Sequence, residues 1–338
     1  MTSAPLDARP GDAPPAIVAN GLTKAFDAEP VVRDVDLKLA RGSILGLIGP
    51  SGCGKTTTVR LLTGLLRPTA GAAYVGGTEA TRLTPAQRQR IGYLPQIPAL
   101  FDDLSLVENL NFHASMYGLP LRRRRRRLRA LLDWVELLPD RRKRVRDVSG
   151  GMQRRLALAS TFVHDPQYAF LDEPTAGIDP ILRDKFWQEF RTMRDEGRTL
   201  LVTTQYVGEA AHCDLVGLLS DGELLMVDSP ENLRRAAFGG EVVDLVLHRP
   251  PTDAEVADLE RLPVVVGSVE RLDPVSLRIV VDDAMRALDV LRQRTASGGL
   301  SIVEANEHIV DYDEAFVRVV ERHRQQLTPA GGEEARRG

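Results

Sequence analysis

The chain has 338 residues, enough for two domains and a sizeable core in at least one of them. Its apolar fraction of 43% and charged fraction of 27% are typical of a globular protein, and a net charge of −3 argues against a general nucleic-acid binder. The two cysteines, Cys53 and Cys213, fit a reducing cytosol better than a disulfide scaffold. The six histidines show no metal-ligand spacing.

Residues 1–16 lack the basic and apolar regions of a secretory signal, and their proline content predicts a disordered lead-in. No apolar run approaches the roughly 18–20 residues that span a bilayer. If the protein works at a membrane, we therefore expect another chain to provide the span.

An α/β domain is predicted over residues 17–235. Short, nearly continuous apolar runs are typical of strands buried on both faces of a mainly parallel sheet. These runs lie at 43–49, 167–173 and 199–205. Helical periodicity appears between them at 55–66 and 181–194. Residues 216–228 are predicted to form a hairpin that turns at Asp221-Gly222.

The segment at about 100–150 differs, because its leucines repeat at helical spacing among many arginines. This pattern predicts an inserted helical subdomain. The run "RRRRRR" at 122–127 has two interpretations. It can be a solvated helix face, or a polybasic cluster attracted to anionic lipid headgroups, a gain of ~1 kcal/mol per charge. The sequence leaves both open.

Residues 240–326 have a third sequence pattern, which predicts strands and helices in the order β-α-β-β-α-β and a further helix near 312–325. This order predicts a small ferredoxin-like α+β domain. It contains no visible catalytic constellation, so regulation, dimer contact or partner contact is the expected role. Residues 327–338 are predicted to be a disordered tail.

The stretch "GPSGCGKTT" follows an apolar strand and opens a helix, the context that a phosphate-binding P-loop requires. In such a loop the backbone N–H groups cradle phosphates, Lys55 reaches the β and γ oxygens, and Thr56 binds Mg²⁺. A glycine-rich turn with a fortuitous lysine is disfavoured, because no position of the motif mismatches. The expected nucleotide contacts are Gly49, Pro50, Ser51, Gly52, Cys53, Gly54, Lys55, Thr56 and Thr57. Cys53 occupies a free position, which favours a small tolerated residue over a redox role.

Two adjacent carboxylates follow the apolar run in "YAFLDEP". Asp172 ends the predicted strand, where its carboxylate can hold Mg²⁺ through water. Glu173 comes next and can act as the general base that polarises the attacking water. The pattern is common alone, and the P-loop upstream makes it specific.

The stretch "VSGGM" opens a predicted helix at 148–152. With the P-loop and "FLDEP", it resembles the nucleotide-binding subunit of an ABC transporter, whose LSGGQ-type signature it matches. The resemblance implies that Ser149, Gly150 and Gly151 contact the γ-phosphate held by the opposite subunit. A helix cap at Ser149 is compatible with that role, since two glycines and a serine at a helix N-terminus form an anion site.

Further motifs match in order over residues 17–230. The resemblance implies that Gln96 is the Q-loop glutamine, which senses Mg²⁺ and water and links to the membrane subunit. Asp179 in "TAGIDP" corresponds to the D-loop. Phe26 stands where the family places an aromatic ring that stacks on adenine, with packing into the core as the alternative.

One position departs from the family pattern. A histidine that contacts the γ-phosphate usually follows the strand at 199–204, and this chain has Gln205 instead. A glutamine amide can donate a hydrogen bond but cannot shuttle a proton. Because Glu173 is intact, we expect ATP hydrolysis to persist.

The fold implied by the resemblance is a P-loop (RecA-like) ABC ATPase core with the helical insert. The implied function is that of a homodimeric, Mg²⁺-dependent subunit that binds and hydrolyses ATP. Separate polytopic permease subunits would hold it at the cytoplasmic face of the membrane. "TTQY", the TAGIDP turn and the small C-terminal domain are similar to the daunorubicin-resistance branch, whose membrane subunits are of the ABC-2 type. That similarity favours efflux of drugs or other hydrophobic compounds, with lipid or polysaccharide export as alternatives.

Two other classes of protein carry a P-loop. Soluble ABC ATPases of DNA repair or translation usually have two cassettes or a long coiled-coil insertion, and neither is present here. A P-loop kinase or GTPase that acts alone has no use for the signature at 148–152. No nucleic-acid partner is expected.

Overall fold

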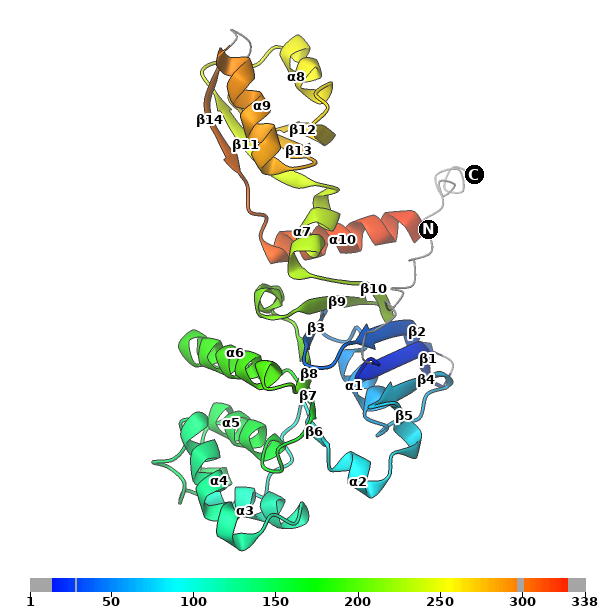
Figure 1. Cartoon of the computed structure of the whole chain (residues 1–338), viewed down its shortest axis with the longest axis vertical. Helices are drawn as coiled ribbons and strands as arrows, with labels where there is room; N and C mark the ends of the chain where they lie inside the picture. The colour runs from blue at the N-terminus through cyan, green and yellow to red at the C-terminus, as the bar shows by residue number, and fades with distance from the viewer. Residues whose placement is uncertain (1–13, 28, 297–300, 328–338) are drawn as a thin grey trace, which may run out of the picture. The chain divides into compact units, whose positions relative to one another are not determined.

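The computed structural model of the chain describes residues 14–27, 29–296 and 301–327. The chain divides into two units between Val227 and Asp228 (Figure 1). The predicted lead-in, apart from residues 14–16, and the predicted tail from residue 328 onward lie outside the described residues.

A six-stranded sheet forms the centre of the first unit, in the order β10-β9-β3-β8-β7-β6. Its strands are β3 (Ile44–Ile48), β6 (Ile91–Leu94), β7 (Tyr168–Asp172), β8 (Thr199–Thr204), β9 (Leu215–Ser220) and β10 (Glu223–Asp228). The pairings from β9 through β3, β8 and β7 to β6 are parallel. Every residue of β3, β7 and β8 is buried, which explains their continuous apolar runs and confirms the three predicted strands.

The predicted hairpin joins β9 to β10 at Asp221 and Gly222, whose φ angles are 49° and 84°. Two positive φ angles are required by the turn type that matches the twist of a two-residue hairpin, so this prediction is confirmed. The Gly222 N–H also donates a hydrogen bond to the Cys53 carbonyl oxygen at 3.1 Å. The hairpin therefore braces the glycine loop.

A second, antiparallel sheet with the order β2-β1-β4-β5 was not predicted. Its strands are β1 (Ile17–Phe26), β2 (Glu29–Leu39), β4 (Ala70–Val75) and β5 (Thr78–Glu79). The register of β1 against β2 shifts three times between Ala19 and Ala25, which interrupts the alternation of apolar and polar residues. Both sheets and helix α1 contribute to one apolar core.

Five further helices belong to the first unit, and two of them, α1 and α6, match predicted helices. They are α1 (Lys55–Leu62), η1 (Ala80–Arg82), α2 (Pro85–Arg88), α6 (Pro180–Asp195) and η3 (Val207–His212). Helix α1 ends four residues before its expected end, because Gly64 takes a φ of 70°. A Cβ at Gly64 would lie 2.0 Å from the Ala80 carbonyl oxygen, so the chain must turn there.

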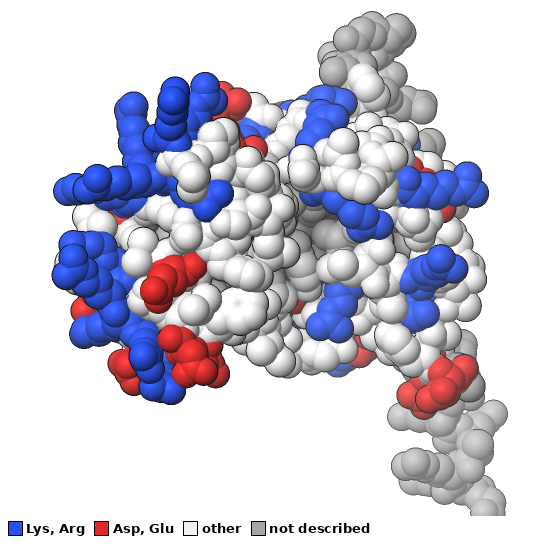
Figure 2. Space-filling model, turned by 90° about the horizontal axis from the view of Figure 1, so that it is seen from below, with Lys and Arg blue, Asp and Glu red and all other residues white. Residues whose placement is uncertain are grey.

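Two helices fall in the segment expected to be helical, and the helix that the signature at 148–152 was predicted to open follows them (Figure 1). The three helices are α3 (Leu106–Met116), α4 (Leu121–Trp134) and α5 (Gly150–Thr161), with the short η2 (Val145–Asp147) before α5. The Trp134 ring meets Phe162 and Phe186 edge to face, with centroids 5.5 and 5.8 Å apart, which anchors the segment on α6. Lys and Arg side chains gather over it at the left of Figure 2.

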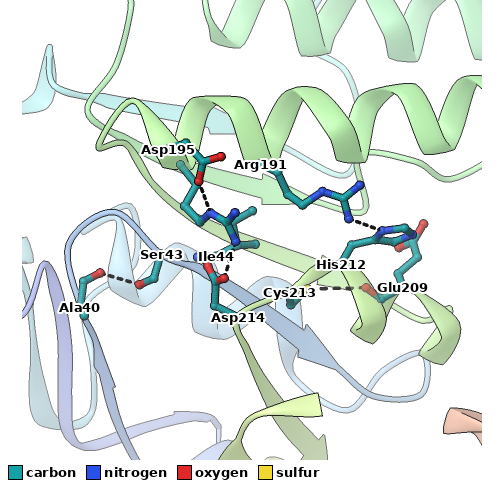
Figure 3. Close-up of polar contacts among 10 residues, drawn as sticks. Ala40, Ser43, Ile44, Arg191, Asp195, Glu209, His212, Cys213 and Asp214 are labelled. Carbon is teal, nitrogen blue, oxygen red and sulfur yellow. Dashed lines mark hydrogen bonds and ion pairs between the residues drawn. The ribbon is translucent and has the colours of Figure 1, made fainter. Parts of the chain in front are cut away.

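A polar cluster fixes the start of β3, the strand that leads into the glycine loop (Figure 3). The Asp214 carboxylate accepts a hydrogen bond from the Ile44 N–H at 2.8 Å and one from Arg194. Arg194 also donates to Asp195 at 2.9 Å. These contacts tie the end of α6 and the start of β9 to β3, and so hold the parallel strands in register.

The second unit has the element order that was predicted for 240–326. A four-stranded sheet with the order β12-β13-β11-β14 is antiparallel at every pairing. Its elements are β11 (Glu241–Leu247), α8 (Asp253–Glu260), β12 (Val265–Arg271), β13 (Ser276–Val281), α9 (Ala284–Ala296) and β14 (Ile302–Glu307). Apolar residues of the sheet and of both helices form one core.

Two further helices, α7 (Pro230–Phe238) and α10 (Tyr312–Leu327), belong to the second unit. Phe238 of α7 and Ala315 of α10 share a small apolar cluster, and the Arg318 guanidinium lies 4.0 Å from the centre of the Phe238 ring. The structure therefore places the division at Val227, before the predicted boundary at 235. In the described residues, no helix is both long and apolar enough to cross a bilayer.

Candidate functional site

The structure brings four of the predicted site segments to one edge of the parallel sheet. Gly49 follows β3, Gln205 follows β8, Asp172 ends β7, and Gln96 lies just beyond β6. These four strands are consecutive neighbours in the sheet. Because parallel strands end at the same edge, loops far apart in sequence meet there, where open α/β sheets bind ligands.

The glycine loop crosses from β3 into α1 with a buried lysine at its end. Lys55 is the first residue of α1, and its Nζ donates hydrogen bonds to the carbonyl oxygens of Gly49 at 2.7 Å and Pro50 at 2.9 Å. Gly52 and Gly54 have φ angles of 82° and 105°, which L side chains rarely adopt. The loop therefore needs glycine at these two positions.

Close backbone contacts explain the other constraint on this loop. A Cβ at Gly49 would lie 2.1 Å from the Leu219 carbonyl oxygen of β9. Cys53 is also buried, and burial raises the pKa of its thiol. A buried thiol with a raised pKa is a poor nucleophile, which supports the small-residue interpretation over a redox role.

Asp172 is wholly buried at the end of β7. Its Oδ1 accepts a hydrogen bond from the Thr203 hydroxyl at 2.5 Å, whereas its Oδ2 has no hydrogen-bond partner in the described residues. A buried carboxylate oxygen without a partner is costly unless a cation or a water offsets its charge. The site therefore fits a hard divalent cation such as Mg²⁺, which prefers oxygen ligands.

Glu173 has a strained backbone, with a φ of 53°. Its N–H donates to the Thr203 carbonyl oxygen at 3.1 Å and to the Thr203 hydroxyl at 3.0 Å, which holds this conformation. Its side chain is half-buried. Thr203 thus positions both carboxylate residues, although no sequence motif indicates this role.

Arg154 is a second residue that the sequence analysis missed. It lies in α5 and is buried, and its guanidinium donates to the carbonyl oxygens of Pro95 at 2.7 Å and Gln96 at 2.6 Å. It also donates to the carbonyl oxygens of Asp172 and of Glu173, the latter at 2.7 Å. One side chain therefore joins α5 to the ends of β6 and β7.

Glu209 connects the segments that follow β7 and β8. Its buried Oε1 accepts a hydrogen bond from the Thr175 hydroxyl at 2.7 Å and pairs with Arg183 at 3.7 Å. The Arg183 guanidinium lies 4.7 Å from the centre of the Tyr206 ring, beside Gln205. In Figure 3 the neighbouring His212 faces Arg191, with 3.0 Å between Nδ1 and Nη1. This network orders the chain around Gln205.

The signature segment begins α5 at the surface. Ser149 caps this helix, since its Oγ accepts a hydrogen bond from the Met152 N–H at 3.3 Å. A Cβ at Gly150 would meet nothing within 4 Å. Packing within the chain therefore does not require glycine at position 150.

Asp179 is likewise an exposed helix cap, whose carboxylate accepts a hydrogen bond from the Leu182 N–H at 3.0 Å at the start of α6.

Three predicted contact residues have exposed side chains. The Phe26 ring is 48% exposed, with the Lys24 Nζ 5.1 Å from its centre, which contradicts the alternative that it packs into the core. Gln96 and Gln205 are exposed. In the part of the chain that the structure describes, no hydrogen bond joins either amide side chain to the glycine loop.

Comparison with known proteins decides the family. The family model for ABC transporters matches residues 32–176. The daunorubicin resistance ATP-binding protein DrrA3 of Streptomyces coeruleorubidus is 36% identical over 306 residues, which cover 90% of this chain and 95% of that protein. The chain belongs to the ABC transporter ATP-binding proteins. This ABC protein is therefore an ATP-binding ATP hydrolase.

Two further similarities agree. The Nod factor export ATP-binding protein I of Cupriavidus pinatubonensis is 37% identical over 223 residues, which cover 66% of this ABC protein and 69% of that relative. The ATP-binding cassette MJ0796, solved as a dimer in a post-hydrolysis state with ADP and Pi, has a TM-score of 0.59 and 25% identity. The match covers 63% of this chain and 98% of that one. The first unit thus has the mixed α/β fold of ABC ATPases.

Proposed function

We propose that this ABC protein is the ATPase subunit of an exporter, works as a homodimer, and drives separate membrane subunits of the ABC-2 type. The single observation that carries the catalytic part is the buried, unpartnered Oδ2 of Asp172 at the edge where the glycine loop and Glu173 meet. The daunorubicin resistance relative supports efflux of drugs or other hydrophobic compounds. The Nod factor export relative shows that similar proteins are not confined to drug resistance, and export of lipid or polysaccharide is the alternative.

Asp172, Thr56 and Gln96 would hold Mg²⁺ together with the β and γ phosphates of ATP. Bound there, the ion would neutralise phosphate charge. The amides of the glycine loop and Lys55 orient the phosphates, and Phe26 stacks on adenine. Glu173 takes a proton from the attacking water, and Gln205 donates a hydrogen bond to the γ-phosphate.

The second half of each pocket comes from another copy of the chain. Ser149, Gly150 and Gly151 of that copy contact the γ-phosphate, and its Asp179 lies beside them. The open space at Gly150 supports this proposal, because an approaching phosphate needs room where a side chain would otherwise stand. ATP then favours the closed dimer, and its hydrolysis removes the γ-phosphate that bridges the halves.

The second unit is proposed to be a ferredoxin-like accessory domain. Its element order and its strand order β12-β13-β11-β14 support that topology. Its role is contact with the dimer mate or another partner, or regulation. Association with membrane subunits places the protein peripherally at the cytoplasmic face of the membrane, with the first unit, which ends at Val227, as the ATPase domain.

The test is ATP hydrolysis by purified protein with its membrane partner. Glu173→Gln should bind ATP without turnover. Lys55→Ala and Ser149→Ala should each be inactive, yet a mixture of the two should regain part of the activity, since a mixed dimer contains one intact pocket. Full hydrolysis by a strict monomer that tolerates Ser149→Ala contradicts the proposal. Stimulation of hydrolysis by DNA or ribosomes favours a soluble ABC ATPase instead.

A further inference from the structure

Helix α4 displays a one-sided cluster of arginines, called here the arginine face. Its members are Arg122, Arg123, Arg125, Arg126 and Arg129. At 100° per residue they occupy an arc of about 160°. The buried residues Leu128, Leu131 and Leu132 all lie outside this arc. All five arginines are exposed, and none has an ion pair or side-chain hydrogen bond within the described residues.

The two remaining arginines of the run have structural roles. Arg124 donates hydrogen bonds to the Ser115 hydroxyl and the Leu119 carbonyl oxygen, both at 2.7 Å. Arg127 donates to the Phe162 carbonyl oxygen at 2.7 Å. The run therefore contains two arginines that hold the helices together, whereas the arginine face contributes no such contact.

The arginine face also works against its own helix. Arg122 and Arg126, like Arg125 and Arg129, are like charges four residues apart, which destabilises an isolated helix. The first turn of α4 has no acidic residue, and positive charge there opposes the helix dipole. Asp133 near the C-terminal end is the only acidic residue of α4. Binding to an anionic surface would offset this repulsion.

Exposed apolar side chains border the arginine face at the loop between α3 and α4. Met116 ends α3 and is 65% exposed, and Leu121 begins α4 and is 77% exposed. Phe112 lies one turn before Met116, and its ring is 4.5 Å from that of Phe101. Arginines beside exposed apolar residues match a bilayer interface, which offers phosphates and, just below them, acyl chains.

We propose that the arginine face binds the surface of an anionic phospholipid bilayer, with Met116 and Leu121 at its boundary. This inference rests on the proposed function for its membrane setting, and it gives the ATPase a contact with lipid that needs no permease. Nucleic acid, the other abundant polyanion, is disfavoured because the whole chain carries a net charge of −3 and the rim of the face is apolar.

The experiment measures binding of the purified full chain to vesicles by flotation. One set of vesicles contains phosphatidylcholine alone, and the other contains phosphatidylcholine and phosphatidylglycerol. The test variant is R122Q/R125Q/R126Q. Its matched control is R41Q/R67Q/R88Q, which removes the same charge from exposed arginines without side-chain partners in the described residues. Glutamine keeps the helix propensity close to that of arginine.

We expect binding to the phosphatidylglycerol vesicles that weakens as salt rises. Each lost arginine should lower partitioning about fivefold, so the test variant should bind about a hundredfold more weakly, while the control keeps most of its binding. Equal binding by the test variant and the native chain overturns the proposal. The proposal is also overturned if both variants lose binding equally, or if the native chain binds equally to the two kinds of vesicle. A third contrary result is that the native chain and the control bind duplex DNA while the test variant does not. ATP hydrolysis measured alongside separates this outcome from failure of the proposed function.

Discussion

Arg154 offers the most direct test of how the catalytic edge is held together. Arg154 is 6% exposed, and its guanidinium donates to four backbone carbonyl oxygens, two beyond β6 and two at the end of β7. Replacing it with methionine removes the donor from all of these hydrogen bonds. Hydrogen bonds to charged groups contribute about 1.5–3 kcal/mol each and are not additive, so we expect a total loss of about 3–5 kcal/mol. For a unit of this size, that lowers Tm by about 10 °C.

A conservative variant of Arg154 separates its effect on the positions of the catalytic residues from its effect on fold stability. Arg154→Lys keeps the charge, but a compact ammonium cannot serve four carbonyl oxygens in one plane, so about 1–2 kcal/mol is lost. The carbonyls of Gln96 and Glu173 then shift. We expect kcat to fall by about tenfold or more. KM for ATP should change less, because in the described residues Arg154 makes no hydrogen bond to the glycine loop.

The matched control is the neighbouring Arg155, whose guanidinium donates to the Val135 carbonyl oxygen at 3.0 Å, far along the chain from the catalytic residues. Arg155→Lys should leave kcat nearly unchanged. Thermal melting and steady-state ATP hydrolysis, measured with the membrane partner, provide both readouts. Native Tm and native kcat in Arg154→Met refute the positioning role, and so does an equal loss of kcat in Arg155→Lys.

Three further predictions concern single residues of the site. Gly150→Ala should not lower Tm, because the position is open and alanine favours a helix, yet it should lower ATP hydrolysis if the phosphate of ATP bound to a second copy approaches there. Gly49→Ala should instead destabilise the fold by about 1–3 kcal/mol, because its Cβ would meet the Leu219 carbonyl oxygen. Melting curves distinguish the two variants. Asp172→Asn should keep the fold but abolish the gain in ATP affinity that Mg²⁺ confers, which calorimetry with and without Mg²⁺ measures; an unchanged gain contradicts the assignment. Burial raises the pKa of the Cys53 and Cys213 thiols, so at pH 8 less reactive thiolate is present than in a free cysteine. A thiol reagent should therefore label both residues only after denaturation. Rapid labelling of the native chain contradicts their burial.

The parallel strands and the phosphate loop could be predicted because their physics is local. A strand buried on both faces must be apolar throughout, as β3, β7 and β8 are. A loop that turns from β3 into α1 around Lys55 needs glycine at fixed positions. Such constraints act on neighbours in sequence, so they leave a pattern that can be read.

The antiparallel sheet and Arg154 could not be predicted in the same way. Shifts of register in β1 break the period of two, because the unpaired residues move apolar side chains out of alternation. Arg154 stands next to a second arginine in α5, and its partners are backbone carbonyls near residues 95 and 172. One signal was available: Arg154, Leu158 and Thr161 share helical spacing on the buried side of α5, where an arginine needs partners.

In the proposed switch, some site residues are held by contacts within one chain, and others are left at the surface for a second copy. Within one chain, Arg154 and Thr203 fix the two carboxylate residues and the backbone at Gln96 through contacts that involve no nucleotide. Ser149 and Gly150 instead lie at the surface at the start of α5, where a Cβ added at position 150 would contact nothing within 4 Å. A ligand shifts a conformational equilibrium only through its differential affinity for the two states. Because these contacts hold the half-site of one chain without help from a second copy, the proposed switch can use the free energy of ATP binding to bring the second copy into place.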